Sequence, residues 1–191
     1  AALGAFGAWQ KRGGSHAVET APGEIEIIAL ESGGEITLAG GSRIVIERGD
    51  RLVSLERGQA LFRVENDAGA PFTVRVGEDT LVDVGTVFDV ARTTEGLRVA
   101  VSEGAVVLNP GVDDARVSPG QVLSLNAATR RFEIGSVALE QVGEWREGRL
   151  TFQDTSLEDV AADLSRATGT PFVASPRAGE QRVSGSIVLD G

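Results

Sequence analysis

From Glu24 to about Ile134 the chain alternates apolar and polar residues with a period of two, and glycines interrupt the alternation at short intervals. About eleven apolar runs recur near the spacing of about 8–12 residues that is typical of all-β domains. Glycine supplies 25 of the 191 residues, and residues such as Gly58 and Gly104 stand where positive φ permits tight reversals. The pattern therefore predicts a mainly β domain over residues 24–135, built as an antiparallel β-sandwich, a barrel or a β-solenoid-like stack.

The pattern changes after Trp145. Residues 150–152 are typical of a short strand, and residues 157–167 carry the i, i+3, i+4, i+7 apolar stripe of an amphipathic helix, with Ser156 as N-cap and Gly169 at its end. Two further strands are predicted over 171–174 and 182–189. These elements predict a small α+β (βαββ) unit over 149–191, joined by a linker over 136–148. Because the unit stops abruptly after a strand, we expect it to be truncated at its C-terminus.

The first nine residues are wholly apolar, and Lys11 and Arg12 follow shortly after them. Nine residues are too few to cross a bilayer, which needs about 20. Such a start is typical of the end of a transmembrane helix with Trp9 at the interface, although a loosely docked terminus would look similar. We therefore expect residues 1–23 to be a membrane-proximal segment, the end of a transmembrane helix followed by a linker.

Composition excludes several classes of function. Lys and Arg number 18 against 28 for Asp and Glu, and the resulting net charge of −10 disfavours binding to nucleic acid. Cysteine is absent, and His16 is the single histidine. Disulfides, thiolate zinc sites and multi-histidine metal sites cannot be assembled within this chain. Because His16 lies in a polar N-terminal stretch, we expect no Ser-His-Asp triad either. We therefore predict no cofactor, no metal and no conventional enzyme.

Four segments occur in an ordered set: 52–64 (LVSLERGQALFRV), 71–74 (PFTV), 84–90 (VGTVFDV) and 99–106 (VAVSEGAV). Together they resemble the FecR-type anti-sigma factor (sigma regulator) family. The tail 145–152 (WREGRLTF), with Leu157 and Val160 after it, resembles the secretin/TonB short N-terminal (STN) module that ends many such regulators. The resemblance covers residues 24–191.

This resemblance implies a single-pass inner-membrane protein of which this chain is the periplasmic part. The implied partner is the signalling domain of a TonB-dependent outer-membrane receptor loaded with an iron chelate. A missing cytoplasmic part would bind an extracytoplasmic-function sigma factor. A missing transmembrane helix would anchor the protein in the inner membrane.

A module of this kind could bind its partner by strand addition, in which an exposed sheet edge offers unpaired backbone groups. Val183, Gly185 and Ile187 are the candidates for that edge, and Phe152 and Phe172 are candidate apolar anchors beside it. The alternative for both phenylalanines is a place in the core.

The bond between Gly85 and Thr86 is the one candidate for chemistry. The resemblance implies that the threonine hydroxyl can attack the preceding carbonyl and cleave the chain there. A hydroxyl nucleophile needs a base or backbone strain, and Asp83 and Asp89 are the carboxylates near in sequence. The alternative is a structural glycine turn followed by a β-branched strand residue.

Two other classes of function remain open from the sequence. One is an envelope structural or carbohydrate-binding β module, which would need exposed aromatic residues, whereas the chain has two tryptophans and no tyrosine. The other is an enzyme with a cupin-like or hydrolase-like barrel, which the single histidine disfavours.

Overall fold

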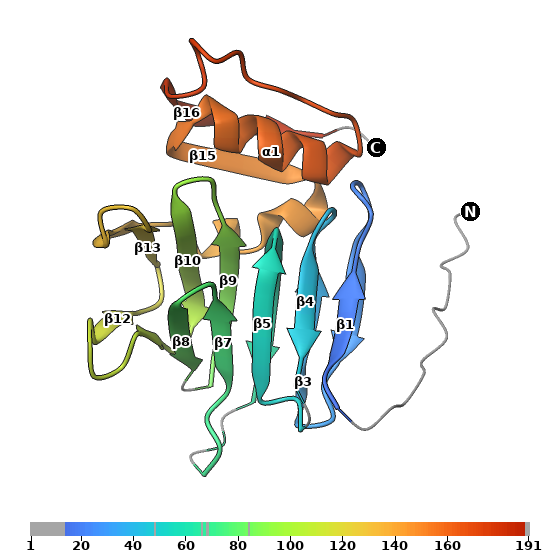
Figure 1. The fold of residues 1–191 in the computed structure, drawn as a ribbon, viewed down its shortest axis with the longest axis vertical. Helices are drawn as coiled ribbons and strands as arrows, with labels where there is room; N and C mark the ends of the chain where they lie inside the picture. The colour runs from blue at the N-terminus through green and yellow to red at the C-terminus, as the bar shows by residue number, and fades with distance from the viewer. Residues whose placement is uncertain (1–13, 48, 66, 68, 84, 190–191) are drawn as a thin grey trace.

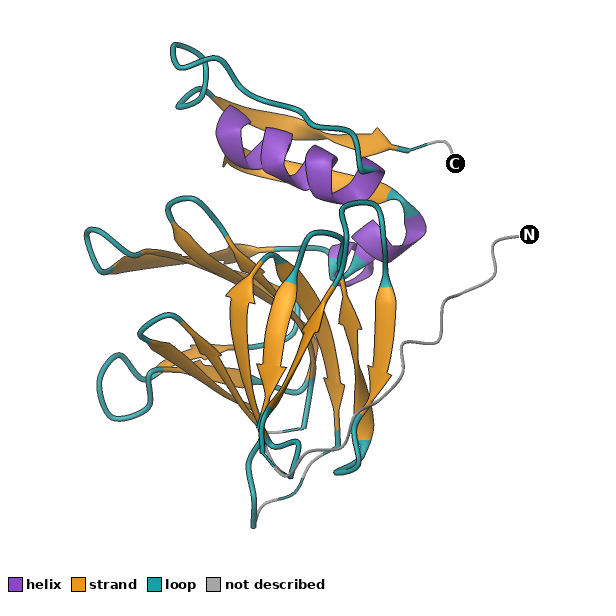
Figure 2. Ribbon diagram, turned by 45° about the vertical axis from the view of Figure 1, so that its right-hand side comes forward, coloured by secondary structure: helices purple, strands orange, loops and turns teal. Residues whose placement is uncertain are grey.

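The computed structural model describes residues 14–47, 49–65, 67, 69–83 and 85–189. Two seven-stranded sheets face one another and form a β-sandwich, and a unit of two strands and one helix lies across one end of it (Figures 1 and 2). The predicted β domain is thus a sandwich and not a closed barrel.

The first sheet contains, in order, β1 (His16–Glu19), β4 (Arg43–Ile46), β5 (Leu52–Arg57), β7 (Thr73–Val76), β8 (Asp79–Asp83), β11 (Val106–Leu108) and β12 (Ala115–Val117). The second sheet contains, in order, β14 (Arg131–Ser136), β13 (Gln121–Asn126), β10 (Gly96–Glu103), β9 (Val87–Arg92), β6 (Gln59–Val64), β3 (Gly34–Leu38) and β2 (Glu26–Ala29). Neighbouring strands are antiparallel except for β5 and β7, which are parallel.

The core lies between the two sheets, because the alternating pattern directs one apolar face of each sheet inward. Phe62, Phe72 and Phe88 are among its largest fully buried side chains. The rings of Phe62 and Phe88 stack with centroids 5.0 Å apart, and those of Phe62 and Phe72 lie tilted at 5.8 Å. All the apolar runs that the sequence pattern identified contribute strand residues. The strands β1, β12 and β14 lie outside those runs.

After the sandwich the chain makes two 3₁₀ turns, η1 (Leu139–Gln141) and η2 (Glu144–Glu147). The C-terminal unit then comprises β15 (Arg149–Ser156), α1 (Leu157–Thr168) and β16 (Arg182–Val188). The predicted caps of the helix are confirmed: the Ser156 side chain accepts a hydrogen bond from Asp159 N–H, and Gly169 is the left-handed C-cap with a φ of 74°.

The strand predicted over 171–174 is wrong, because those residues form no ladder and the unit is βαβ in its described part. The backbone of Phe172 is instead bound by the Ser165 side chain, whose hydroxyl accepts from Phe172 N–H at 2.8 Å. Val173 is 90% exposed. A period-two apolar segment forms a strand only where a neighbouring strand can pair with it, and none does so here.

A second hydrophobic cluster joins the C-terminal unit to the sandwich. Leu61, Val87 and Ala100 lie on the outer face of the second sheet and pack in one cluster with Leu150 and Phe152 of β15. Trp145 and Val160 belong to the same cluster. The unit therefore shares its core with the sandwich instead of enclosing one of its own.

The expected transmembrane end and its interfacial Trp9 fall within residues 1–13, outside the described residues. Among the residues that are described, no helix is long and apolar enough to cross a membrane.

Candidate functional site

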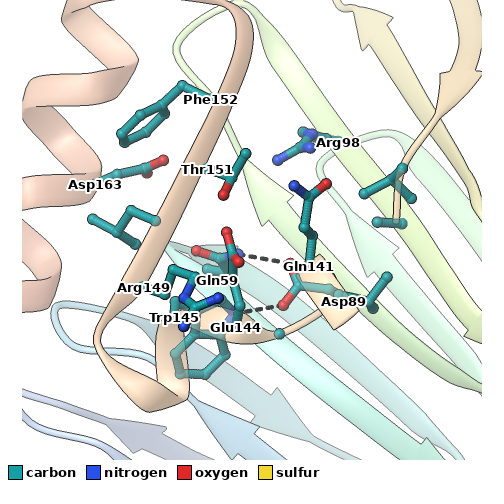
Figure 3. Close-up of a pocket in the computed structure, with 15 residues that line it drawn as sticks. Gln59, Asp89, Arg98, Gln141, Glu144, Trp145, Arg149, Thr151, Phe152 and Asp163 are labelled. Atoms are coloured by element: carbon teal, nitrogen blue, oxygen red, sulfur yellow. Dashed lines mark hydrogen bonds between the residues drawn. The ribbon is translucent and has the colours of Figure 1, made fainter. Parts of the chain in front are cut away.

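The sandwich and the C-terminal unit meet around a buried carboxylate, Asp89, on β9 (Figure 3). Trp145 in η2 donates its indole N–H to Asp89 Oδ2 at 2.6 Å, and the side-chain amide of Gln59 donates to Asp89 Oδ1 at 2.7 Å. Asp89 and Trp145 are 7% and 8% exposed. Both carboxylate oxygens thus have a donor, which is the condition on which a carboxylate can be buried.

Two ionisable groups at this junction are perturbed. Burial raises the pKa of Asp89, and the hydrogen bonds from Trp145 and Gln59 oppose the rise. Burial lowers the pKa of Arg98 on β10, and attraction to Asp89 and Glu144 opposes the fall. Perturbed ionisable groups cluster at functional sites. The junction is therefore the leading candidate site of the molecule.

Hydrogen bonds at both ends of α1 hold the helix against the loops of the sandwich. Near its N-terminus Asp159 Oδ1 accepts from the Thr94 backbone N–H at 2.9 Å and from the Thr94 hydroxyl at 3.0 Å. Near its C-terminus the backbone N–H of Gly23 donates to Arg166 O at 2.8 Å. These bonds fix the direction in which the helix crosses the ends of the strands (Figure 1).

The predicted cleavage bond, between Gly85 and Thr86, lies immediately before β9. Gly85 has a φ of 84°, and its N–H donates to Asp83 Oδ2 at 2.9 Å. Thr86 is 3% exposed, and its Oγ1 hydrogen-bonds to no residue in the described part of the chain. The backbone of Gly104 lies so close that a Cβ there would be 2.1 Å from Gly85 O. The Thr86 hydroxyl is therefore buried next to a crowded peptide carbonyl.

Asp83 and Asp89, the two carboxylates near this bond in the sequence, make different contacts in the structure. Asp83 is 4% exposed and binds Gly85 N–H directly. Asp89 binds Trp145 and Gln59 at the junction instead. Of the two, only Asp83 is shown in contact with the Gly85–Thr86 segment.

The residues named for partner binding are divided by the structure. Phe152, Val183, Gly185 and Ile187 lie on the two-stranded sheet of β15 and β16, where Gly185 pairs with Phe152. Phe152 is 6% exposed in the second hydrophobic cluster, and Val183 packs against that cluster. Ile187 is 36% exposed and Phe172 is 43% exposed. Phe172 follows the helix and lies outside the strands.

One edge of β16 pairs with β15, and the other edge has no strand neighbour among the described residues. The backbone N–H of Leu189 donates to Gly148 O at 2.8 Å. Hydrogen-bonded pairs alternate along an antiparallel ladder. Ile187 therefore points its backbone groups at β15, and Ser186 points its N–H and C=O at the free edge.

Within the residues that the structure describes, no group of three or more His, Asp or Glu side chains could hold a metal ion. A cavity of about 210 Å³ lies beneath α1, lined in part by Ile25, Trp145, Leu150, Ala167 and Leu189. Its lining is mainly apolar and continues the second hydrophobic cluster.

Sequence reasoning missed the junction. From the sequence, Trp145 was only the first residue of a motif and Asp89 only a carboxylate near Thr86. Gln59 and Arg98 were not predicted to have a function. The sequence held no clear signal for the junction, because Asp89 and Arg98 each lie between apolar neighbours, which is the pattern expected of residues on the outer face of a strand.

Comparison with known proteins finds a family match over part of the sandwich and the same fold in two solved structures. Residues 16–107 match the family model described as FecR protein. No curated protein sequence matches the chain. Two crystal structures of a protein from Parabacteroides distasonis ATCC 8503, classed as an anti-sigma factor, share the fold with a TM-score of 0.82 at 24% identity. The matches cover 92% and 93% of this chain and 86% of the neighbour. At this identity they establish the fold alone, including most of the part beyond residue 107.

Proposed function

This chain belongs to the FecR family of signalling regulators through residues 16–107, and we propose that it is the periplasmic signal-receiving region of an inner-membrane anti-sigma regulator. Its proposed partner is the N-terminal signalling domain of a TonB-dependent outer-membrane receptor. The response would pass through the cytoplasmic part of the protein to an extracytoplasmic-function sigma factor, in control of iron-chelate uptake. The family match is the observation that carries this proposal.

The free edge of β16 supports a place for the receptor contact. Its unpaired backbone groups could accept an added strand, which is a common mode of peptide recognition. Ile187 is 36% exposed and Val188 is 63% exposed, so apolar side chains accompany these backbone groups. Phe152 is the one anchor from the sequence analysis that burial removes from a surface contact in this arrangement.

Affinity capture from detergent-solubilised envelope of the source cells tests the proposal, with the tagged chain as bait and mass spectrometry as the readout. Wild-type bait should enrich one TonB-dependent receptor. Ser186→Pro removes the N–H that faces the free edge and should abolish capture, because an added strand loses a backbone donor. Ser186→Ala keeps that N–H and is the matched control.

The outcomes separate the two claims. Equal capture by wild type and both variants would leave the receptor as partner and refute the β16 edge as its site. Failure of wild-type bait to enrich any such receptor, from cells shown to express one, would refute the receptor function itself.

A second candidate function is self-cleavage between Gly85 and Thr86. The buried Oγ1 of Thr86, which bonds to no described residue, favours it. In the proposed step Oγ1 attacks the Gly85 carbonyl carbon, an ester replaces the amide, and the hydroxyl proton passes to the released Thr86 nitrogen. Water then hydrolyses the ester. The carboxylate of Asp83, bound to Gly85 N–H, is the candidate to move the proton.

Intact-mass measurement over a long incubation tests this reaction. Wild type should yield the two fragments that end at Gly85 and begin at Thr86. Thr86→Ala should remain whole, and Thr86→Ser should retain cleavage because it keeps a hydroxyl. A wild-type chain that stays whole throughout would exclude self-cleavage.

A further inference from the structure

Arg98 projects from β10 toward β15 at the junction, opposite Thr151 (Figure 3). Its guanidinium makes no hydrogen bond or ion pair with any residue that the structure describes. Asp89 and Glu144 attract it, but both oxygens of Asp89 are already bound by Trp145 and Gln59. A guanidinium is a planar set of donors without an acceptor, and a partly buried one normally binds a carboxylate, a carbonyl or a phosphate.

Arg98 also lines a polar cleft of about 470 Å³. One wall is formed by residues of β10, β13 and β14, and the other by residues 153–156 of β15 together with the start of α1. The cleft is therefore shaped by both parts of the molecule, and its width depends on how the C-terminal unit is seated.

Several charged groups of this cleft already have partners. Arg182 binds Asp154 with Nε and Oδ2 3.0 Å apart and lies 3.4 Å from a carboxylate oxygen of Glu95. Asp159 accepts hydrogen bonds from Thr94 and from the hydroxyl of Ser156. These groups satisfy one another's hydrogen bonds, but the three carboxylates outnumber Arg182 and leave two net negative charges among these groups.

Arg98, Arg131 and Glu133 are the lining charges for which no bond is found in the described part of the chain. Two positive groups and one negative group leave one net positive charge. The whole lining, however, has three arginines and four carboxylates, so the overall charge of the cleft does not attract an anion, and an anion would bind here through the unbonded guanidinium of Arg98. A singly charged anion at Arg98 meets less repulsion from the acidic groups that share the cleft than a dianionic phosphate would. A carboxylate also matches the fork of a guanidinium through two parallel hydrogen bonds.

We propose that Arg98 binds a carboxylate that enters this cleft from outside the chain. The carboxylate belongs either to an acidic side chain of an extended peptide or to a small free acid. The site is separate from the β16 edge and does not depend on the receptor proposal.

Arg98 also lines a smaller pocket beside this cleft, and the β15 residues of that pocket offer a second point of attachment for a peptide. Leu150 and Phe152 belong to the hydrogen-bonded pairs of β15 and β16, since the Leu189–Gly148 bond sets the alternation. Thr151, between them, directs its backbone N–H and C=O to the other edge of β15. A peptide backbone could bind there while its acidic side chain reaches Arg98.

Titration of the intact chain followed by NMR tests the proposal, with the indole N–H signal of Trp145 as the reporter. This group bonds to Asp89 close to Arg98, and Trp145→Phe distinguishes its signal from that of Trp9. The probes are glutarate, a capped Gly-Glu-Gly peptide and its Gly-Gln-Gly analogue at constant ionic strength. The glutamyl peptide should give a saturable shift, and the glutaminyl peptide should not.

Arg98→Gln should weaken this binding at least about tenfold, which corresponds to the lower range for a charge-assisted hydrogen bond. Arg98→Lys keeps the charge without the fork and should weaken it less. Arg75→Gln removes an exposed charge on the opposite sheet and is the matched control, with unchanged affinity expected. Circular dichroism of each variant checks that it is folded. If Arg98→Gln does not fold, the affinity of Arg98→Lys tests the proposal in its place.

The probes separate the two sources of the carboxylate. Binding of the peptide but not of glutarate would assign the site to an acidic segment, and equal binding of both would assign it to free acids. Equal affinity of wild type and the folded Arg98 variants, or the absence of a saturable shift with either acid, would overturn the proposal.

Discussion

The hydrogen bond from Trp145 to Asp89 should contribute more to stability than an ordinary buried hydrogen bond, because its acceptor is a buried carboxylate. Trp145→Phe keeps an aromatic ring but removes the donor that lies 2.6 Å from Asp89 Oδ2. A hydrogen bond to a charged group contributes about 1.5–3 kcal/mol, against about 0.5–1.5 kcal/mol for a neutral one. The smaller ring also loses packing, which adds a further cost of about 1 kcal/mol.

A double-mutant cycle with Asp89→Asn isolates the charged part of that contribution. Asparagine keeps the shape and an acceptor oxygen but carries no charge, so Trp145→Phe should cost about 1–2 kcal/mol less in the Asp89→Asn background. The packing loss is the same in both backgrounds and cancels. Urea unfolding followed by circular dichroism at neutral pH gives the four free energies.

The cycle also tests the protonation state of Asp89. Burial raises the pKa of Asp89, so its contribution to stability is fully present below the ordinary value of 3.8 and is lost as the pH rises through the folded value. At neutral pH Asp89→Asn alone should therefore leave stability unchanged or raise it. A coupling energy within about 0.3 kcal/mol of zero would refute the reasoning, because the indole would then bond equally well to a neutral acceptor.

Three further predictions concern other parts of the molecule. Gly104→Ala should destabilise the fold by more than about 1 kcal/mol in urea unfolding, because φ is +74° there and a Cβ would lie 2.1 Å from Gly85 O; an unchanged midpoint would show that this approach relaxes freely. Burial raises the pKa of Asp79, but the hydrogen bonds from Arg130 and Asn109 outweigh that effect and hold the pKa below its ordinary value of 3.8. The stability they supply is present above that value and lost as the pH falls below it, so Asp79→Asn should flatten the acid limb of a stability–pH profile. Ser156→Ala should lower the free energy of unfolding by about 1 kcal/mol through loss of the N-cap, and Ser156→Thr, which keeps a hydroxyl that can cap and donate to Asp159, should lower it less.

The elements that the sequence predicted correctly are those whose signals are local. Ser156 and Gly169 bound the helix because capping and a left-handed C-terminus depend on the residues at those positions. The strands of the sandwich follow from alternation, which requires only that one face be buried. The strand over 171–174 failed because a strand also needs a neighbour, and the backbone of Phe172 is bound by Ser165 instead.

The candidate site could not be predicted in the same way, because its residues meet only in three dimensions. Trp145 and Asp89 are 56 residues apart in the chain, and Gln59 and Asp89 are 30 apart. Alternation assigns Asp89 to the outer face of its strand, where a polar residue is expected to meet solvent. Only the docking of the segment from η2 onward turns that outer face into an interior and adds Trp145 to the partner, Gln59, that the neighbouring strand β6 supplies.

The way the C-terminal unit is docked bears on how a signal could pass through it. Apolar residues such as Leu61 and Leu150 stabilise the contact between the C-terminal unit and the sandwich, but they do not fix the orientation of the unit. The Trp145–Asp89 and Thr94–Asp159 bonds supply direction, since each is made in one arrangement only. A buried carboxylate and an unbonded Arg98 both cost stability, so an apolar junction of the same area would be held more tightly. A ligand at Arg98 would add contacts to both sides and tighten the junction. A partner on β16 would bind the same C-terminal unit, so its binding could be coupled to occupancy of the Arg98 cleft through the seating of that unit.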